Sequence, residues 1–126
     1  MINDQEPFMT ADENAYFQEL WTRERGAPVP TFLVATCAGE PPKPNECHRN
    51  AEIFAFENEG FVRVAGWLNE TNASRLAAHS LVENGEGELF EITCEHSFRF
   101  IRHVGELSVF EALRKKFPGL PYRFAG

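Results

Sequence analysis

Basic residues are scarce in this sequence and nowhere clustered. The 126 residues include 12 Lys and Arg against 19 Asp and Glu, which gives a formal net charge of -7 at pH 7. Such a charge repels a phosphate backbone instead of attracting it. We therefore expect no nucleic-acid partner.

Long apolar runs and regularly spaced cysteines are absent as well. No segment approaches the ~18 consecutive apolar residues that cross a bilayer, and the first residues lack the basic and apolar regions of a signal peptide. The three cysteines have no repeating spacing, which is typical of free thiols in a reducing compartment. These absences predict a cytoplasmic protein without a membrane partner.

The chain contains enough apolar side chains for one core. Hydrophobic residues make up 43% of the sequence and include 12 Phe, and no internal repeat or low-complexity segment divides it. We expect a single domain over residues 1–126, with its core within about residues 31–118.

Start and stop signals predict three helices. Capping-box patterns begin at Thr10 and at Ser108, each with a Glu three residues later. Asn45 is a favourable N-cap after a proline-rich loop. The expected helices cover residues 11–25, residues 46–58 and the stretch from Ser108 to Pro118.

Short segments rich in β-branched and aromatic residues predict a sheet. They alternate with Asn, Gly and Ser clusters, as consecutive antiparallel strands do. The segments are residues 61–68, 75–83, 89–94 and 98–103, with a further brief strand in residues 31–36. The expected fold is therefore α+β, with helices packed on an antiparallel sheet of four or five strands.

One cysteine occupies a position that suits a nucleophile. With Asn45 as N-cap, Cys47 falls in the first helical turn, where free N–H groups and the helix dipole favour a thiolate. If Asn45 caps the N–H of His48 and not that of Cys47, the Cys47 amide stays free to stabilise an oxyanion. Because a lone cysteine is more often buried and unreactive, this interpretation depends on the position of Cys47.

Two polar residues interrupt apolar strand segments and can complete a catalytic unit. His79 lies within an apolar strand segment, and Glu91 lies in the next one. The imidazole of His79 can act as general base for the thiol if the second helix packs on the sheet face that carries His79, and a carboxylate can orient the ring through its second nitrogen. A three-residue loop, residues 84–86, would place Glu91 opposite His79, whereas a two-residue turn would place Phe90 there.

The motifs around these residues also resemble a known family. The matching segments are Cys47-His48-Arg49-Asn50, Gly66-Trp67, residues 78–82, residues 87–93 and Phe98-Arg99-Phe100. This pattern is similar to that of small uncharacterised bacterial and phage proteins with a Cys-His-x-Asn helix start, a Gly-Trp strand, a His-centred strand and an Asp-x-Thr strand. Here Glu91 replaces the Asp of that family, and Cys94 replaces a Pro.

The order of Cys, His and acid resembles that of papain-like and transglutaminase-like enzymes. The resemblance implies Cys47 as nucleophile, His79 as general base and Glu91 as the orienting acid. The implied reaction is hydrolysis of, or acyl transfer from, an amide, ester or thioester through a thioester on Cys47. No cofactor or metal is expected.

The oxyanion donor and the substrate contacts have weaker sequence signals. No Gln lies just before Cys47, where papain has its oxyanion donor, so Asn45 and Asn50 are candidates for that role. Trp67 is a candidate substrate contact, although the aromatic residues of the strand segments are expected in the core.

Two other functions remain as alternatives. A papain-like fold without catalysis would be a binding module, because a fold does not guarantee its chemistry. A zinc site is the second alternative, with candidate ligands Cys47, His48, His79, Cys94 and His96. Their spacing argues against zinc, since no paired Cys-x-x-Cys or His-x-x-x-His is present.

Overall fold

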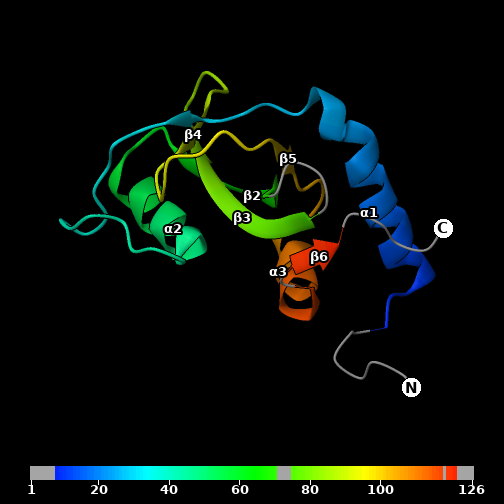
Figure 1. The fold of residues 1–126 in the computed structure, drawn as a ribbon. Helices are drawn as coiled ribbons and strands as arrows, with labels where there is room; N and C mark the ends of the chain where they lie inside the picture. The colour runs from blue at the N-terminus through cyan, green and yellow to red at the C-terminus, as the bar shows by residue number, and fades with distance from the viewer. Residues whose placement is uncertain (1–7, 71–74, 118, 122–126) are drawn as a thin grey trace.

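The computed structural model describes residues 8–70, 75–117 and 119–121. Its helices are α1 (Ala11–Arg23), α2 (Cys47–Glu57) and α3 (Leu107–Lys116), with a 3-10 turn, η1 (Glu24–Gly26), after α1. Its strands are β1 (Thr31–Phe32), β2 (Val62–Asn69), β3 (Arg75–Glu83), β4 (Leu89–Glu91), β5 (Phe100–Arg102) and β6 (Gly119–Pro121) (Figure 1). The α+β class is confirmed. Among the described helices, none combines the length and apolar composition needed to cross a membrane.

The strands form one mixed sheet. Their order is β1-β4-β3-β2-β5, and β6 pairs with β3. The successive strands β2, β3 and β4 are antiparallel neighbours, as the sequence predicted. The expectation of a wholly antiparallel, consecutive sheet is wrong at both ends, because β1 is parallel to β4 and β5 pairs with β2. Pairing between such distant segments leaves no local pattern in the sequence.

The first helix begins as predicted, whereas the second does not. The Thr10 hydroxyl accepts the Glu13 N–H at 3.1 Å, and the Glu13 carboxylate accepts the Thr10 N–H at 2.9 Å. In α2 the N-cap is Glu46, not Asn45, and no side chain caps the helix. Asn45 adopts a left-handed backbone with a φ of 64°, which turns the chain into α2. The N-cap side chain therefore leaves the first-turn amides of α2 without a cap within the described part of the chain.

The predicted capping box at Ser108 is also wrong. Helix α3 begins at Leu107, with Glu106 as N-cap and no side-chain cap. Glu111, the expected partner of Ser108, accepts hydrogen bonds from Arg63 and Arg114 instead. A charged tertiary partner thus replaces the local contact.

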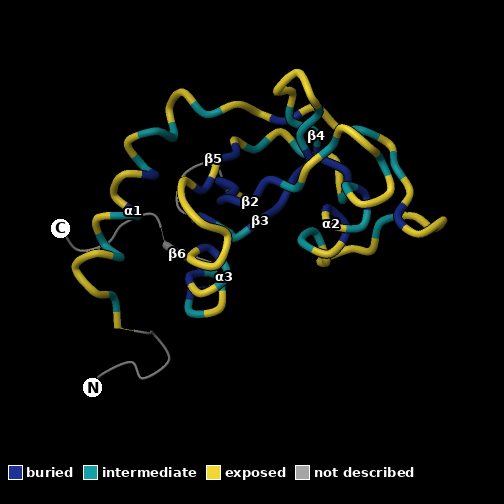
Figure 2. The backbone as a smooth tube through the Cα atoms, turned by 180° about the vertical axis from the view of Figure 1, so that it is seen from behind, coloured by how far each residue is buried: buried dark blue, intermediate teal, exposed yellow. Residues whose placement is uncertain are grey.

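All three helices pack on one face of the sheet. Trp67 pairs with Ala78, and Ala65 pairs with Ser80, so these side chains share that face. The core on this face contains Phe17, Leu20, Ala51, Phe54, Phe110 and Leu113 from the helices and Ala65, Trp67, Leu76, Val82 and Ile101 from the strands. Figure 2 shows the resulting burial of β2 and β3 at the centre of the molecule.

His79 lies on the opposite face, because it pairs with Gly66 and alternates with Ser80 along β3. A smaller apolar cluster covers this face, made of Val64, Leu68, Leu81, Leu89, Phe98 and Phe100. Gly66 has no room for a side chain, since a Cβ there would lie 2.3 Å from the carbonyl oxygen of Ile101. Glycine at this position permits the close approach of β5.

On the edge of β3 that faces away from β2, strand pairing is interrupted beside His79. Strand β4 pairs with Val82 and Glu83, and β6 pairs with residues 75–77 of β3. Within the described chain, residues 78–81 therefore have no strand partner on this edge. A side chain from a neighbouring element can reach His79 past this interval.

Candidate active site

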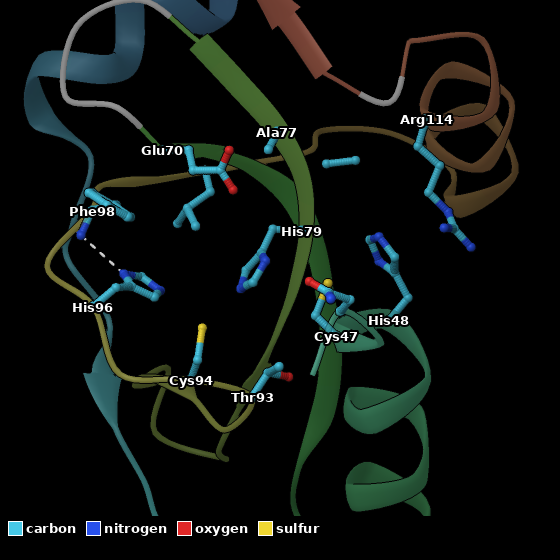
Figure 3. A pocket seen from close by; sticks show the side chains of 13 residues that line it. Cys47, His48, Glu70, Ala77, His79, Thr93, Cys94, His96, Phe98 and Arg114 are labelled. Atoms are coloured by element: carbon cyan, nitrogen blue, oxygen red, sulfur yellow. Dashed lines mark hydrogen bonds between the residues drawn. The ribbon is translucent and has the colours of Figure 1, made fainter. Parts of the chain in front are cut away.

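A cavity of about 380 Å³ lies beside this interval of β3. Of the predicted site residues, Asn45, Cys47 and His79 line it. The other lining residues are His48, Leu68, Glu70, Ala77, Ala78, Thr93, Cys94, His96, Phe98 and Arg114 (Figure 3). Glu91 lies behind His79, out of the cavity wall, with 1% of its surface exposed.

Cys47 is the first residue of α2, and its half-buried thiol contacts two imidazoles. Burial raises the pKa of this thiol, but hydrogen bonds from His48 and His79, together with the charge of His79, lower the pKa to about 6. The two imidazoles therefore make the thiolate the main form of Cys47 at pH 7.

The route by which Cys47 reaches His79 differs from the expected one. The sequence suggested that the second helix covers the sheet face that carries His79, but α2 packs on the other face, where His48 contacts Ser80 at 2.6 Å. In Figure 3 the β3 ribbon passes between His79 and His48, with Cys47 beside the strand. The interrupted edge of β3 lets the sulfur contact both rings.

His79 pairs with Glu91 as the sequence predicted. Its Nε2 lies 2.5 Å from Glu91 Oε1, which leaves Nδ1 for the sulfur of Cys47. Burial lowers the pKa of His79, but hydrogen bonds to Cys47 and Glu91 and their negative charges raise it to about 10. At neutral pH the site therefore holds a thiolate and an imidazolium, with the carboxylate behind them.

The register between β3 and β4 that brings His79 to Glu91 differs from the two registers that the sequence predicted. Glu83 pairs with Leu89, so the loop between β3 and β4 has five residues instead of three. Glu91 is consequently a diagonal neighbour of His79, two residues from the directly opposed position. Because the loop has an odd number of residues, as in the three-residue case, the side chains of His79 and Glu91 stay on the same face of the sheet. Glu is one methylene longer than Asp, which helps its carboxylate reach His79 from the diagonal position.

Three donors hold the Glu91 carboxylate in place. Oε1 accepts from Nε2 of His79 and from Nε2 of His96 at 2.7 Å, and Oε2 accepts the Thr93 N–H at 3.0 Å. Burial raises the pKa of Glu91, but the hydrogen bond and charge of His79 and the bonds from Thr93 and His96 keep it below its ordinary value. The acid therefore stays ionised without contact to solvent.

His96, which the sequence indicated only as a candidate zinc ligand, is part of the site because it binds Glu91. Its Nδ1 accepts the N–H of Phe98 at 3.0 Å, and its ring stacks on that of Phe98 at 5.4 Å. Since Nδ1 accepts, the proton must be on Nε2, which donates to Glu91. His96 thus fixes the carboxylate from the side away from Cys47. Its loop carries no periodicity that would have indicated this contact.

Of the predicted zinc ligands, the structure brings His79 and His96 together with Glu91, with ligand atoms within 4.8 Å of one another. A histidine that binds a metal through Nε2 normally donates from Nδ1 to a carboxylate or a carbonyl group. In His96, however, Nδ1 faces the N–H donor of Phe98. The donor set fits a hydrogen-bonded carboxylate and does not fit a metal ion.

The three predicted oxyanion or substrate residues have different places. Asn50 is buried, and its amide binds the backbone of Lys43 and the hydroxyl of Thr93, so it braces α2 against the turn after Glu91. Trp67 is fully buried, and its Nε1 donates to the hydroxyl of Tyr16. Only Asn45 lines the cavity among these three. The candidate roles of Asn50 and Trp67 at the substrate are therefore wrong.

The other two cysteines lack the environment of Cys47. Burial and the charge of Glu57 raise the pKa of the Cys37 thiol. Burial and the charge of Glu91 raise the pKa of Cys94, which is exposed at the cavity. Among the three thiols, Cys47 is thus the one stabilised as a thiolate.

This chain matches no model of a known protein family, no curated protein and no solved structure. The likeness of its motifs to papain-like and transglutaminase-like enzymes therefore stays a prediction. Function has to be inferred from the geometry of the site.

Proposed function

We propose that the protein is a cysteine hydrolase or acyltransferase that acts on an amide, ester or thioester. The observation that carries this proposal is that Cys47 and His79 line one cavity, and that the His79 ring hydrogen-bonds both to Cys47 and, through Nε2, to the buried Glu91 behind it. This arrangement supplies a nucleophile, a proton carrier and a group that fixes the ring.

The reaction would proceed in two balanced steps. The Cys47 thiolate forms a bond to the carbonyl carbon, and the leaving group departs with the proton from Nδ1 of His79. A thioester then remains on Cys47. Neutral His79 next takes a proton from water or an amine, which attacks the thioester and releases the thiolate. Glu91 keeps Nε2 protonated and the ring aligned throughout.

A reactive ester tests this proposal without knowledge of the natural substrate. We expect p-nitrophenyl acetate to acetylate Cys47, as mapped by mass spectrometry of peptides, and Cys47→Ser to abolish the adduct. Cys37→Ser is the matched control, because it removes a thiol outside this cavity, and it should keep the adduct. Acetylation only at Cys94, or neither an adduct on Cys47 nor a release of p-nitrophenol that depends on Cys47, would contradict the proposal.

The pH dependence of alkylation tests the state of the thiol separately. Iodoacetamide reacts with the thiolate, so modification of Cys47 should rise with pH through a midpoint of about 6. Cys94 should react only at higher pH, since its pKa is raised. Equal reactivity of the two thiols at pH 6.5 would show that Cys47 is not activated.

A further inference from the structure

The imidazole of His48 also hydrogen-bonds to the thiol of Cys47, and its other partners differ from those of His79. His48 is the second residue of α2 and lines the same cavity from the other side of β3 (Figure 3). Its Nδ1 lies 2.6 Å from the hydroxyl oxygen of Ser80 and 3.2 Å from a terminal nitrogen of Arg63. Whereas His79 is paired with an acid, His48 faces a guanidinium group.

Arg63 determines which nitrogen of His48 carries the proton. Its side chain is 8% exposed and is held by Glu52 and Glu111, each at 3.0 Å. A guanidinium group can only donate, so a terminal N–H directed at Nδ1 requires a lone pair there. The proton of His48 is therefore on Nε2.

Ser80 supports the same tautomer of His48. Its hydroxyl oxygen accepts from Nε of Arg63 at 2.9 Å, so its own hydrogen is free to point toward Nδ1 of His48. The His48 ring also contacts Phe110 of α3, with a centroid separation of 5.8 Å. With Nδ1 engaged in this way, Nε2–H is left for the sulfur of Cys47 and the cavity.

We propose that Nε2–H of His48 is a fixed hydrogen-bond donor to the oxyanion that forms when Cys47 attacks a substrate carbonyl. This inference rests on the proposed acyl-transfer function. As the carbon–sulfur bond forms, the carbonyl π electrons move to oxygen, and the negative charge leaves the sulfur for an atom bonded to the attacked carbon. A donor that contacts the sulfur before attack can contact that oxygen afterwards.

The two imidazoles thus have separate roles that follow from their partners. His79, backed by Glu91, gains and loses the proton of the reaction. His48, backed by Arg63 and Ser80, keeps its proton on Nε2 and donates a hydrogen bond. The first-turn amides of α2, which the N-cap side chain leaves free, are further candidate donors beside Cys47. The side chain of Asn50, bound to Lys43 and Thr93, does not compete for this role.

Comparison of two reactions at Cys47 isolates this role. Acetylation by p-nitrophenyl acetate passes through an oxyanion, whereas alkylation by iodoacetamide does not. His48→Phe keeps a ring against Phe110 but removes the donor, and His48→Gln keeps an N–H near the position of Nε2. At pH 8 we expect His48→Phe to slow acetylation about 100-fold and alkylation less than about threefold. His48→Gln should restore acetylation to within about tenfold of the wild type.

The outcomes separate this inference from the proposed function. If His48→Phe slows both reactions equally, or neither, the oxyanion role is overturned while acyl transfer at Cys47 stands. If wild-type Cys47 is alkylated but never acetylated, the proposed function fails and the role of His48 fails with it. Circular dichroism checks the folding of each variant. Independently of any variant, ring ¹⁵N shifts of the wild type should show His48 with its proton on Nε2, and a proton on Nδ1 would overturn the inference.

Discussion

At the scale of single residues, the partner of each imidazole decides its chemistry. His79 and His96 bind the same oxygen of Glu91, yet only His79 has a second nitrogen directed at a thiol. The second ring nitrogen of His96 accepts a hydrogen bond from the backbone N–H of Phe98, so His96 can position the carboxylate but cannot exchange a proton with Cys47. One buried acid thereby serves two histidines with different roles.

Replacing Glu91 by Gln should weaken the thiolate–imidazolium pair. The change keeps the shape of the side chain but removes the negative charge that helps to raise the pKa of His79. The pKa of His79, followed by NMR, should then fall below about 10, and the midpoint of Cys47 alkylation should move above about 6. Glu95→Gln removes the charge of an exposed neighbour and should change neither value. An unaltered titration in Glu91→Gln would mean that Glu91 does not support the dyad.

At the scale of secondary-structure elements, Gly66 lets strands β2 and β5 approach closely next to His79, the general base. Gly66 pairs with His79 on one side and with Arg102 of β5 on the other. A Cβ on Gly66 would lie 2.3 Å from the Ile101 carbonyl oxygen and 2.6 Å from Phe100 Cζ. Because the closer contact is with backbone, rotation of a side chain cannot relieve it.

Gly66→Ala should therefore destabilise the fold through β2 and β5. We expect the free energy of unfolding, measured by urea denaturation, to fall by about 3 kcal/mol or more. Gly85→Ala is the matched control, because nothing lies within 4 Å of a Cβ at that position, and its effect should be small. A stable Gly66→Ala variant would show that β5 can separate from β2 at little cost.

At the scale of the whole molecule, a chain of hydrogen bonds ties the sheet to two helices. Nε1 of Trp67 donates to the Tyr16 hydroxyl at 2.9 Å, and that hydroxyl lies 2.7 Å from Nδ1 of His103. Nε2 of His103 donates to the carbonyl oxygen of Glu106, the N-cap of α3, at 2.9 Å. Tyr16 in α1 thus accepts from β2 and donates to the segment before α3.

Tyr16→Phe removes the central link of this chain while keeping the aromatic ring. It leaves the indole N–H of Trp67, which is fully buried, without its acceptor, and Nδ1 of His103 without its donor. We expect the free energy of unfolding to fall by about 1–3 kcal/mol, with an unchanged dependence on urea concentration. Thr22→Ala, which removes an exposed hydroxyl from the same helix, should have little effect. Equal stability of the two variants would contradict this account.

The sequence by itself determined the parts of the site that depend on local position. Cys47 lies at the start of a helix because a proline-rich loop ends just before it, and His79 and Glu91 stand out because polar residues in apolar strands need buried partners. The consecutive antiparallel strands β2, β3 and β4 also follow from local pattern. The cap at Asn45 was wrong because its backbone turns the chain instead.

Only the tertiary structure decided how these residues meet. The five-residue loop sets Glu91 diagonally from His79, the interrupted edge of β3 brings Cys47 past the strand, and His48 and His96 acquire opposite environments from distant partners. Each of these features is a contact between segments far apart in the chain or a shift of register by whole residues. Periodicity reports which face a side chain occupies, but not which partner lies across from it, because many registers satisfy the same alternation.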